Sequence, residues 1–540
     1  MKFKRNINVS GVLFASVGAM IGSGWLFGAL YAAQMAGPAA ILSWLIGAFF
    51  VVVIGLAIAE LVTMFPISGG MSIYPYFTHG NFVGFIFGWV SWLSFVVLPP
   101  IEVLAVLQYS SNYIPGLSEK IGKEQHLTSA GLCVAAVLLL LLVYINSVGS
   151  RFMAETNKFL TFWKLSVPFL VIVIFLFSCN NGTENLFQAP GGFAPYGIQG
   201  VLSALAIGGV VFSFNGFQAG VMLAGEAKNA QKTVPIAIIG SIIICALLYG
   251  VLQIAFLLAV PSSSLANGWA SLSFSGDAGP LAGLALMLGI VWLASLLYID
   301  AVVAPFGAGI VYTASASRVL YAMGASGSIP PFLMKMTKGG VPLISLIINF
   351  IVGIVMFFPF PGWDSMMAFL SSAFVLSLCV GPLCLVSLRK QAPEHQRGFR
   401  LPKYKIFAFI AFYFANLMLY WTGWNVIWKL SIAVVIGCVL FTLQIVNGNN
   451  SRIKRVDLKP SVWLVPYFIG FLTISYFGSY GGGLNKITVG WDFAAIALFS
   501  FIIFHLSQIF ALEPSKAKEY INKTLSKHQA TDEFISKKPI

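Results

Sequence analysis

Long apolar segments recur along almost the whole chain and leave little polar sequence between them. Of the 540 residues, 58% are hydrophobic and only 9% are charged, which excludes a water-soluble globule. A helix that crosses a bilayer needs roughly 20 mainly apolar residues. The pattern therefore predicts an all-α polytopic membrane protein whose function lies inside the bilayer.

Fourteen segments meet this length criterion. They cover 12–34, 38–64, 82–111, 127–148, 157–178, 198–226, 233–260, 282–317, 342–360, 364–388, 405–424, 428–447, 461–479 and 491–512. An even number places both termini on one side, where Lys and Arg concentrate in the N-terminal residues and in 389–405 and 452–459. Because basic loops stay in the cytoplasm, we expect both termini there.

These segments divide the chain into four parts. A cytoplasmic N-terminus, 1–11, precedes a core of ten spans, 12–390, four accessory spans, 391–512, and a cytoplasmic tail, 513–540. The tail is polar and rich in lysine, so we expect it to be disordered or to lie on the membrane surface. The formal charge of +14 comes from loops and tail and not from a basic domain, so no nucleic acid partner is expected.

A glycine-dense stretch, Gly22-Ser23-Gly24, interrupts the first apolar segment. Residues without side chains let a helix unwind and expose its N–H and C=O groups. In a bilayer such open backbone is tolerated where it lines a cavity. Close packing of two helices explains the same glycines, so both interpretations stand at this point.

A second interruption, 208–220, lies in the sixth segment. The first and sixth segments correspond if spans one to five and six to ten are two copies of opposite orientation. Paired interruptions at corresponding positions point to a secondary transporter. The second break therefore favours a paired binding site over close packing.

The two breaks suit a small molecule that carries both charges. Unpaired N–H groups attract a carboxylate and unpaired carbonyls attract an ammonium group, and an α-amino acid has both. The candidate substrate-binding residues are Ile21, Gly22, Ser23, Gly24, Phe212, Phe214, Asn215 and Gly216. Phe212 is also a candidate gate that closes over the substrate, although ordinary core packing accounts for it equally well.

Three ionisable residues inside spans are candidates for proton coupling, because charge in a bilayer is costly. Lys164 lies about two turns inside the fifth segment; a lysine held permanently charged by helix-end carbonyls is the alternative. Glu102 and Asp300 lie in the third and eighth segments, at equivalent places of the two proposed copies. Either could face a substrate ammonium group or carry a proton, and structural pairing stays open for both.

The remaining acids, His79 and the cysteines give no evidence for a role in substrate binding or proton coupling. Glu60 and Glu226 are typical of gate or loop anchors, and His79, placed before the third span, is expected to be incidental. The six cysteines (Cys133, Cys179, Cys245, Cys379, Cys384 and Cys438) show no CxxC spacing and no histidine cluster. We expect reduced thiols, no metal, no cofactor and, without a catalytic constellation, no enzyme.

Several motifs together resemble a known family. They are Ile21-Gly22-Ser23-Gly24, Phe212 to Phe217 leading into Gly225-Glu226-Ala227-Lys228-Asn229, Thr233 to Ile238, and Ala316-Ser317-Arg318 to Met323. The combination, over about residues 10–400, resembles the amino acid-polyamine-organocation (APC) permeases. The resemblance implies a five-plus-five inverted-repeat (LeuT-like) core with broken helices one and six. It also implies that Lys164 matches the span-five lysine of proton-coupled members.

Further motifs are Gly24-Trp25-Leu26-Phe27, Ile101-Glu102-Val103 with Gln108-Tyr109, Gly289 to Ala294 and Tyr420 to Trp424. By these motifs the chain most resembles, within that family, the bacterial aspartate-proton symporter type. One departure is Gln218, which stands where many members carry an acid. Proton coupling therefore shifts to Lys164, Glu102 and Asp300. The core spans show no in-membrane arginine for an acidic side chain, so aspartate or glutamate is an analogy and amino acid is the firmer expectation.

The expected function is import of an amino acid by proton symport with alternating access, in a bacterial cytoplasmic membrane. The expected partners are the amino acid, protons and the lipid bilayer. An amino acid/amine exchanger is the main alternative, and a non-transporting receptor of the same fold is a further one. The sequence does not indicate the oligomeric state or the proton stoichiometry.

Overall fold

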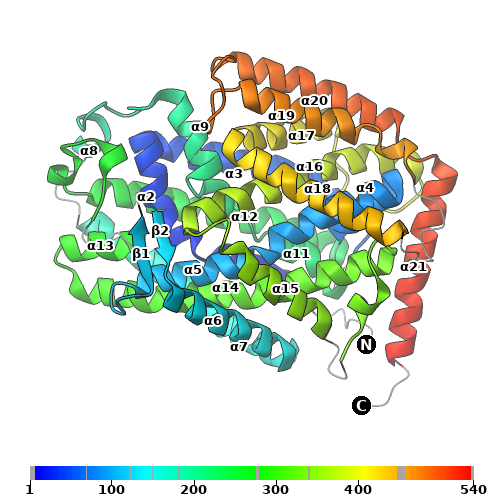
Figure 1. Cartoon of the computed structure of the whole chain (residues 1–540), viewed down its shortest axis with the longest axis horizontal. Helices are drawn as coiled ribbons and strands as arrows, with labels where there is room; N and C mark the ends of the chain where they lie inside the picture. Colours follow the sequence, from blue (N-terminus) through cyan, green and yellow to red (C-terminus); the bar gives the residue numbers. More distant parts are fainter. Residues whose placement is uncertain are drawn as a thin grey trace.

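The computed structural model describes most of the chain as a helical bundle (Figure 1). The described residues are 7–67, 70–121, 124–148, 150–178, 183–274, 279–337, 341–446 and 457–536. Residues 1–6 and 447–456, where several of the basic topology signals lie, and Cys179 are outside these ranges. The other five cysteines are free thiols.

The first half of the chain forms helices that are interrupted at several points. In order they are α1 (Val9–Met20), α2 (Gly24–Ala36), η1 (Gly37–Ala39), α3 (Ala40–Met64), α4 (Gly70–Val96), α5 (Leu98–Ser110), α6 (Ser129–Val148), α7 (Ser150–Phe177), α8 (Glu184–Phe187), α9 (Gly197–Ile207), α10 (Val210–Ser213), α11 (Gln218–Met222), η2 (Ala224–Glu226) and α12 (Ala230–Ala259).

The second half is built in the same way. Its elements are η3 (Ser262–Leu265), η4 (Trp269–Ser271), α13 (Pro280–Met287), α14 (Val291–Ser326), η5 (Pro331–Met334), α15 (Leu343–Met356), α16 (Trp363–Gln391), α17 (Tyr404–Tyr420), α18 (Trp424–Val446), η6 (Lys459–Ser461), α19 (Leu464–Phe477), α20 (Trp491–Ile509) and α21 (Pro514–Ser536).

Within the described part of the chain, ten helical stretches are long and apolar enough to cross a membrane. Two of them, Gly24–Met64 and Met71–Ser110, are about twice the length of a single crossing. Four shorter apolar helices, α1, α9 with α10, α15 and α17, accompany them. Every predicted segment lies on one or more of these helices, and the prediction of an all-α polytopic membrane protein is confirmed.

The helices of the first, second, sixth and seventh segments pack on one another. α12 contacts α3 and α1, α2 contacts α9 and α10, and α11 lies against α1. The helices α4, α5 and α16 are the most enclosed spans, whereas only 28% of the residues in the apolar windows of α6 and α18 are buried. Both glycine-rich stretches belong to the first group of helices, and Glu102 belongs to the enclosed helix α5.

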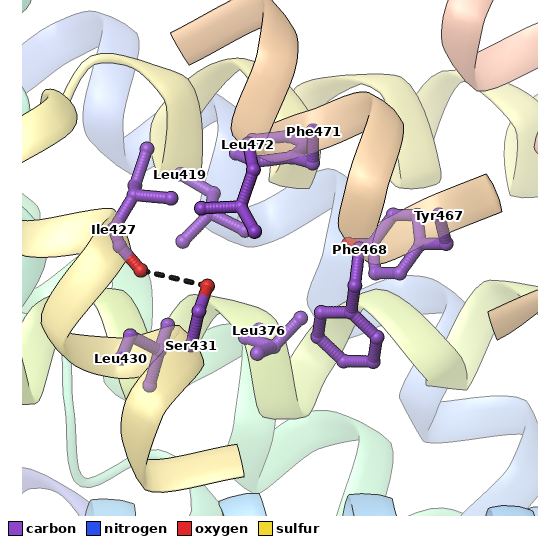
Figure 2. Close-up of a pocket in the computed structure, with 9 residues that line it drawn as sticks. All are labelled: Leu376, Leu419, Ile427, Leu430, Ser431, Tyr467, Phe468, Phe471 and Leu472. Atoms are coloured by element: carbon purple, nitrogen blue, oxygen red, sulfur yellow. Dashed lines mark hydrogen bonds between the residues drawn. The ribbon is translucent and has the colours of Figure 1, made fainter. Parts of the chain in front are cut away.

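The last helices gather on one side of the bundle, where Figure 1 shows α17 to α20 in yellow and orange. A small cavity of about 20 Å³ lies among α16, α17, α18 and α19 (Figure 2). Its lining is apolar apart from the Tyr467 side chain and Ser431, whose hydroxyl donates to the Ile427 carbonyl at 2.9 Å. This cavity is a packing defect with room for about one water molecule.

An antiparallel hairpin joins α5 to α6, which the sequence pattern did not predict. Its strands are β1 (Ser118–Ile121) and β2 (Glu124–Leu127), with Ser118 opposite Leu127. The hairpin and α21 lie toward opposite ends of the bundle in Figure 1.

For the tail, the sequence predicted a segment that is disordered or lies on the membrane surface, and the structure shows a helix there. Residues Pro514–Ser536 form helix α21, which packs against α4 and α16 and buries Ala517 and Ile521. The Asp457 carboxylate accepts hydrogen bonds from Lys516 and Tyr520. Burial and this bond raise the pKa of the Tyr520 phenol, so it remains a donor. The burial of Ala517 and Ile521 and these polar contacts stabilise the helix. The polar composition of the tail alone did not predict a helix.

His79 is also placed differently from the expectation. It lies inside α4 and is fully buried, with Nε2 3.0 Å from the Ser507 carbonyl and Nδ1 2.8 Å from Thr78 Oγ1. The next residue, Gly80, has φ +84°, a conformation that suits glycine. His79 thus links the kink in α4 to α20 and is not an incidental loop residue.

Candidate functional site

Both glycine-rich stretches are breaks in helices. α1 ends at Met20, Ile21 has φ −85° and ψ 85°, and α2 begins at Gly24. In the sixth segment α9 ends at Ile207, and the short helix α10 follows Gly209, whose φ is +91°. The chain leaves helical structure again before α11 begins at Gln218.

The two breaks lie directly against each other. A Cβ added to Gly216 would come within 2.7 Å of the Met20 backbone nitrogen, and Gly216 has φ +134°. A Cβ added to Gly24 would lie 2.5 Å from Ser213 Oγ and 3.0 Å from the Phe212 ring. Contacts this short leave no room for a side chain, so glycine at both positions permits the approach of the two chains.

Two tyrosines from other helices bond to the carbonyls at the breaks. The Tyr312 hydroxyl of α14 donates to the Ala19 carbonyl and lies 2.9 Å from the Asn215 carbonyl. The Tyr249 hydroxyl of α12 donates to the Met20 carbonyl at 3.0 Å. Neither tyrosine was predicted from the sequence as part of the site. A buried tyrosine in an apolar span needs a hydrogen-bond partner for its hydroxyl. This requirement could have marked both tyrosines as neighbours of exposed backbone carbonyls.

Aromatic side chains surround the first break. The Trp363 indole donates to Ser23 Oγ at 3.0 Å and packs edge-on against Phe212, with ring centroids 5.5 Å apart. Phe27 stacks on Trp363 at 4.5 Å. Phe214, which follows α10, is buried and packs edge-on against Trp44, with ring centroids 6.0 Å apart. Trp363 lies far from Ser23 in the sequence, and no motif links the two.

Glu102 reaches the first break from α5. Its Oε2 accepts the Ser23 backbone N–H at 2.8 Å, and the side chain is 2% exposed. A Cβ on Gly22 would lie 2.4 Å from Glu102 Oε1. The structure thus places the Glu102 carboxylate at the first break, where its partner is a backbone N–H group.

Lys164 approaches the same region from α7. Its Nζ donates to the Gly18 carbonyl, in the last turn of α1, at 3.0 Å, and the side chain is buried. The ammonium group also interacts electrostatically with Glu102 and Asp300. The contact with a helix-end carbonyl fits the pinned-lysine alternative, whereas the two acids supply the neighbours that proton exchange needs.

Asp300 lies on α14. Its Oδ1 accepts the Trp163 indole N–H at 2.7 Å, and its side chain is fully buried. Asp300 is therefore hydrogen-bonded to an indole of α7 and also interacts electrostatically with Lys164. The three ionisable candidates thus form one group, from α5, α7 and α14.

The amide side chains at the second break have no partner in the described part of the chain. Both amide atoms of Asn215 and of Gln218 are buried without a hydrogen bond. Such groups are costly to bury unless something else bonds to them. Ile21 is also fully buried. Among the described residues no cluster of three or more His, Cys, Asp or Glu side chains could hold a metal ion.

Glu60 and Glu226, the two acids expected to be gate or loop anchors, form ion pairs with arginines. Glu60 on α3 accepts two bonds from Arg389 of α16, at 2.6 and 2.8 Å, and one from the Leu401 N–H at 2.7 Å. Glu226 lies 4.0 Å from Arg318. Glu60 therefore anchors the end of α3 to α16, as a gate or loop anchor would.

Comparison with known proteins agrees with the sequence motifs. The model of the amino acid permease family matches residues 7–471. The glutamate/serine transporter AimA of Bacillus subtilis is 38% identical over 522 residues, which cover 96% of this chain and 95% of that protein.

Two further relatives are also transporters. The aspartate-proton symporter of Bacillus subtilis is 32% identical over 520 residues, covering 96% of this chain and 98% of the relative. The aromatic amino acid transport protein AroP of Escherichia coli O157:H7 is 26% identical over 487 residues, with 87% and 95% covered. The chain belongs to the amino acid permease family of the APC superfamily, whose members are transporters and not enzymes.

Proposed function

We propose that this permease imports an amino acid together with a proton, by alternating exposure of a site between the two helix breaks. The observation that carries the proposal is the direct contact of the breaks, with Gly216 against the Met20 nitrogen and Gly24 against Ser213. Broken helices that meet inside a bundle are where secondary transporters bind their substrates.

The substrate-binding residues of this proposal are those at the two breaks: Ile21, Gly22, Ser23, Gly24, Phe212, Phe214, Asn215 and Gly216. The unpartnered amide of Asn215 offers both a donor and an acceptor for a polar substrate group. Phe212, packed edge-on against Trp363, is the gate that would move when substrate enters.

The substrate class follows from the chemistry of the site and from the relatives. The names of the two more similar relatives include glutamate, serine and aspartate. We propose a small polar or acidic amino acid. Backbone N–H groups and the Asn215 amide would bind its carboxylates without an arginine.

Proton coupling is assigned to Lys164, Glu102 and Asp300, which interact electrostatically within the bundle. One relative is named as a proton symporter, which supports the assignment. In the proposed cycle, the packed group of α1, α2, α3, α9 to α12 rocks against the remaining core helices. This follows the five-plus-five inverted repeat, with fourteen crossings and both termini in the cytoplasm of a bacterial cell.

The test is uptake by purified protein in proteoliposomes. An inward proton gradient should drive accumulation of aspartate, glutamate or serine, and a protonophore should abolish it. Uptake that needs internal amino acid or amine and ignores the gradient would instead identify an exchanger. Saturable binding without any flux would identify a receptor.

A further inference from the structure

The Ser23 N–H group, at the first break, already bonds to a carboxylate of the same chain. Glu102 Oε2 lies 2.8 Å from the Ser23 nitrogen, and Ser23 is fully buried. Ser23 is the residue that precedes α2, a helix of 13 residues with no acidic residue in its first turn and no local side-chain cap. A carboxylate from α5 therefore occupies the anion position at the start of this helix.

The neighbouring Gly22 shows how closely this carboxylate lies against the break. A Cβ there would come within 2.4 Å of Glu102 Oε1 and 3.0 Å of its carboxyl carbon. Glu102 thus fills the space beside the backbone that a bound carboxylate would need. A second carboxylate cannot enter the same space, and its negative charge would be repelled at short range.

Building on the function proposed above, we propose that Glu102 is a resident stand-in for the α-carboxylate of the substrate. It occupies the Ser23 N–H group while the site is empty and leaves it when an amino acid binds. The exchange keeps the buried N–H group bonded in both states, which avoids the cost of an unsatisfied donor.

The displaced carboxylate has a neighbour of opposite charge. Lys164 of α7 interacts electrostatically with Glu102, and Asp300 of α14 shares the same ammonium group. Gly307 keeps α14 close to this lysine, because a Cβ there would lie 3.1 Å from Lys164 Cε. The other titratable groups in the electrostatic surroundings of Glu102 are the phenols of Tyr312 and Tyr249. Among these named groups, Lys164 is the cation available to the released carboxylate.

This role has the opposite effect on substrate affinity from a role in which Glu102 holds the ammonium group of the substrate. A residue that holds the ammonium group strengthens binding, so its loss weakens binding. A competitor for the carboxylate position opposes binding, so its loss strengthens binding. The two roles are separated by the direction in which substrate affinity moves.

The experiment is equilibrium binding of serine and aspartate to the purified full-length protein in nanodiscs, by calorimetry, for wild type and Glu102→Gln. The neutral amide is a weaker acceptor and does not repel the substrate carboxylate, so the Kd should fall several-fold. Asp300→Asn removes one negative charge near Lys164 without touching Ser23, and it should show no such gain. A Kd that rises in Glu102→Gln, stays unchanged, or falls equally in both variants would overturn the proposal.

A second measurement uses acetate as a probe. Glu102→Ala leaves a carboxylate-sized space beside Gly22, so millimolar acetate should raise the Tm of this variant and leave wild type unchanged. No shift by acetate in this variant counts against the proposal. Neither readout needs transport, so an absence of proton-driven uptake alone would refute symport and leave the stand-in role intact. If wild type binds neither serine nor aspartate, the proposed substrate class and the stand-in role of Glu102 fail together.

Discussion

The Tyr312 hydroxyl lies within hydrogen-bond distance of two carbonyls that belong to different broken helices, those of Ala19 and Asn215. A phenol has a single proton, so it donates to one of the carbonyls at a time. One side chain of α14 therefore links the two breaks to each other and to a third helix. Any relative movement of the breaks has to change the distance from this hydroxyl to at least one of the two carbonyls.

Replacing Tyr312 by Phe removes this link without changing the shape of the ring. We expect a loss of about 1–3 kcal/mol of stability, because buried carbonyls lose their donor, and a marked fall in uptake. Thermal unfolding in detergent and uptake by proteoliposomes measure the two effects. Tyr298→Phe, on the same helix and partly exposed, is the matched control and should change neither. Equal behaviour of the two variants would show that the link is dispensable.

Gly24 and Gly28, one turn apart on α2, offer a test of the contact between the breaks. A Cβ at Gly24 would lie 2.5 Å from Ser213 Oγ and 3.0 Å from the Phe212 ring, whereas a Cβ at Gly28 would meet nothing closer than 3.4 Å, in Trp44. Gly24→Ala should therefore reduce uptake about tenfold or more, because it pushes α10 away. Gly28→Ala should retain most of the activity. Full activity in Gly24→Ala would show that the contact between the breaks is not needed.

Substitution of Lys164 tests whether proton coupling can be lost while substrate transport continues. Lys164→Ala removes the ammonium group that bonds to the Gly18 carbonyl and faces Glu102 and Asp300. We expect proton-driven accumulation to be lost, while exchange of labelled for unlabelled substrate continues. Uptake is followed with and without an imposed gradient. Accumulation that still follows the gradient would transfer the role to one of the acids.

Substitution of Glu60 tests whether its ion pair with Arg389 holds α3 to α16. Both side chains are largely buried and joined by two short hydrogen bonds. Glu60→Gln leaves the arginine without its counter-charge, which typically costs about 3–5 kcal/mol in a buried pair, so the Tm should fall clearly. Glu394→Gln breaks the exposed pair with Lys518 and should leave the Tm unchanged. A Tm for Glu60→Gln that matches wild type would show that the pair is not a structural anchor.

Two features could be predicted from the amino-acid sequence alone: the class of the protein and the places where its helices break. Hydrophobicity over roughly 20 residues is a local property that fixes which segments are helices in a bilayer, and glycine removes side chains wherever it stands. For this reason the breaks at Gly22 to Gly24 and at Gly208 to Gly220 were found without a structure. The family motifs lie on those same segments.

The groups that meet at the breaks could not be predicted without the packing of the helices. Ser23 is bonded by Glu102 and Trp363, and Gly216 rests on Met20, although these residues lie far apart along the chain. The tail helix α21 and the burial of His79 were missed for the same reason, since their partners Asp457 and Ser507 come from other segments. Hydrogen bonds between distant segments depend on how helices pack, and hydrophobic periodicity does not encode that packing.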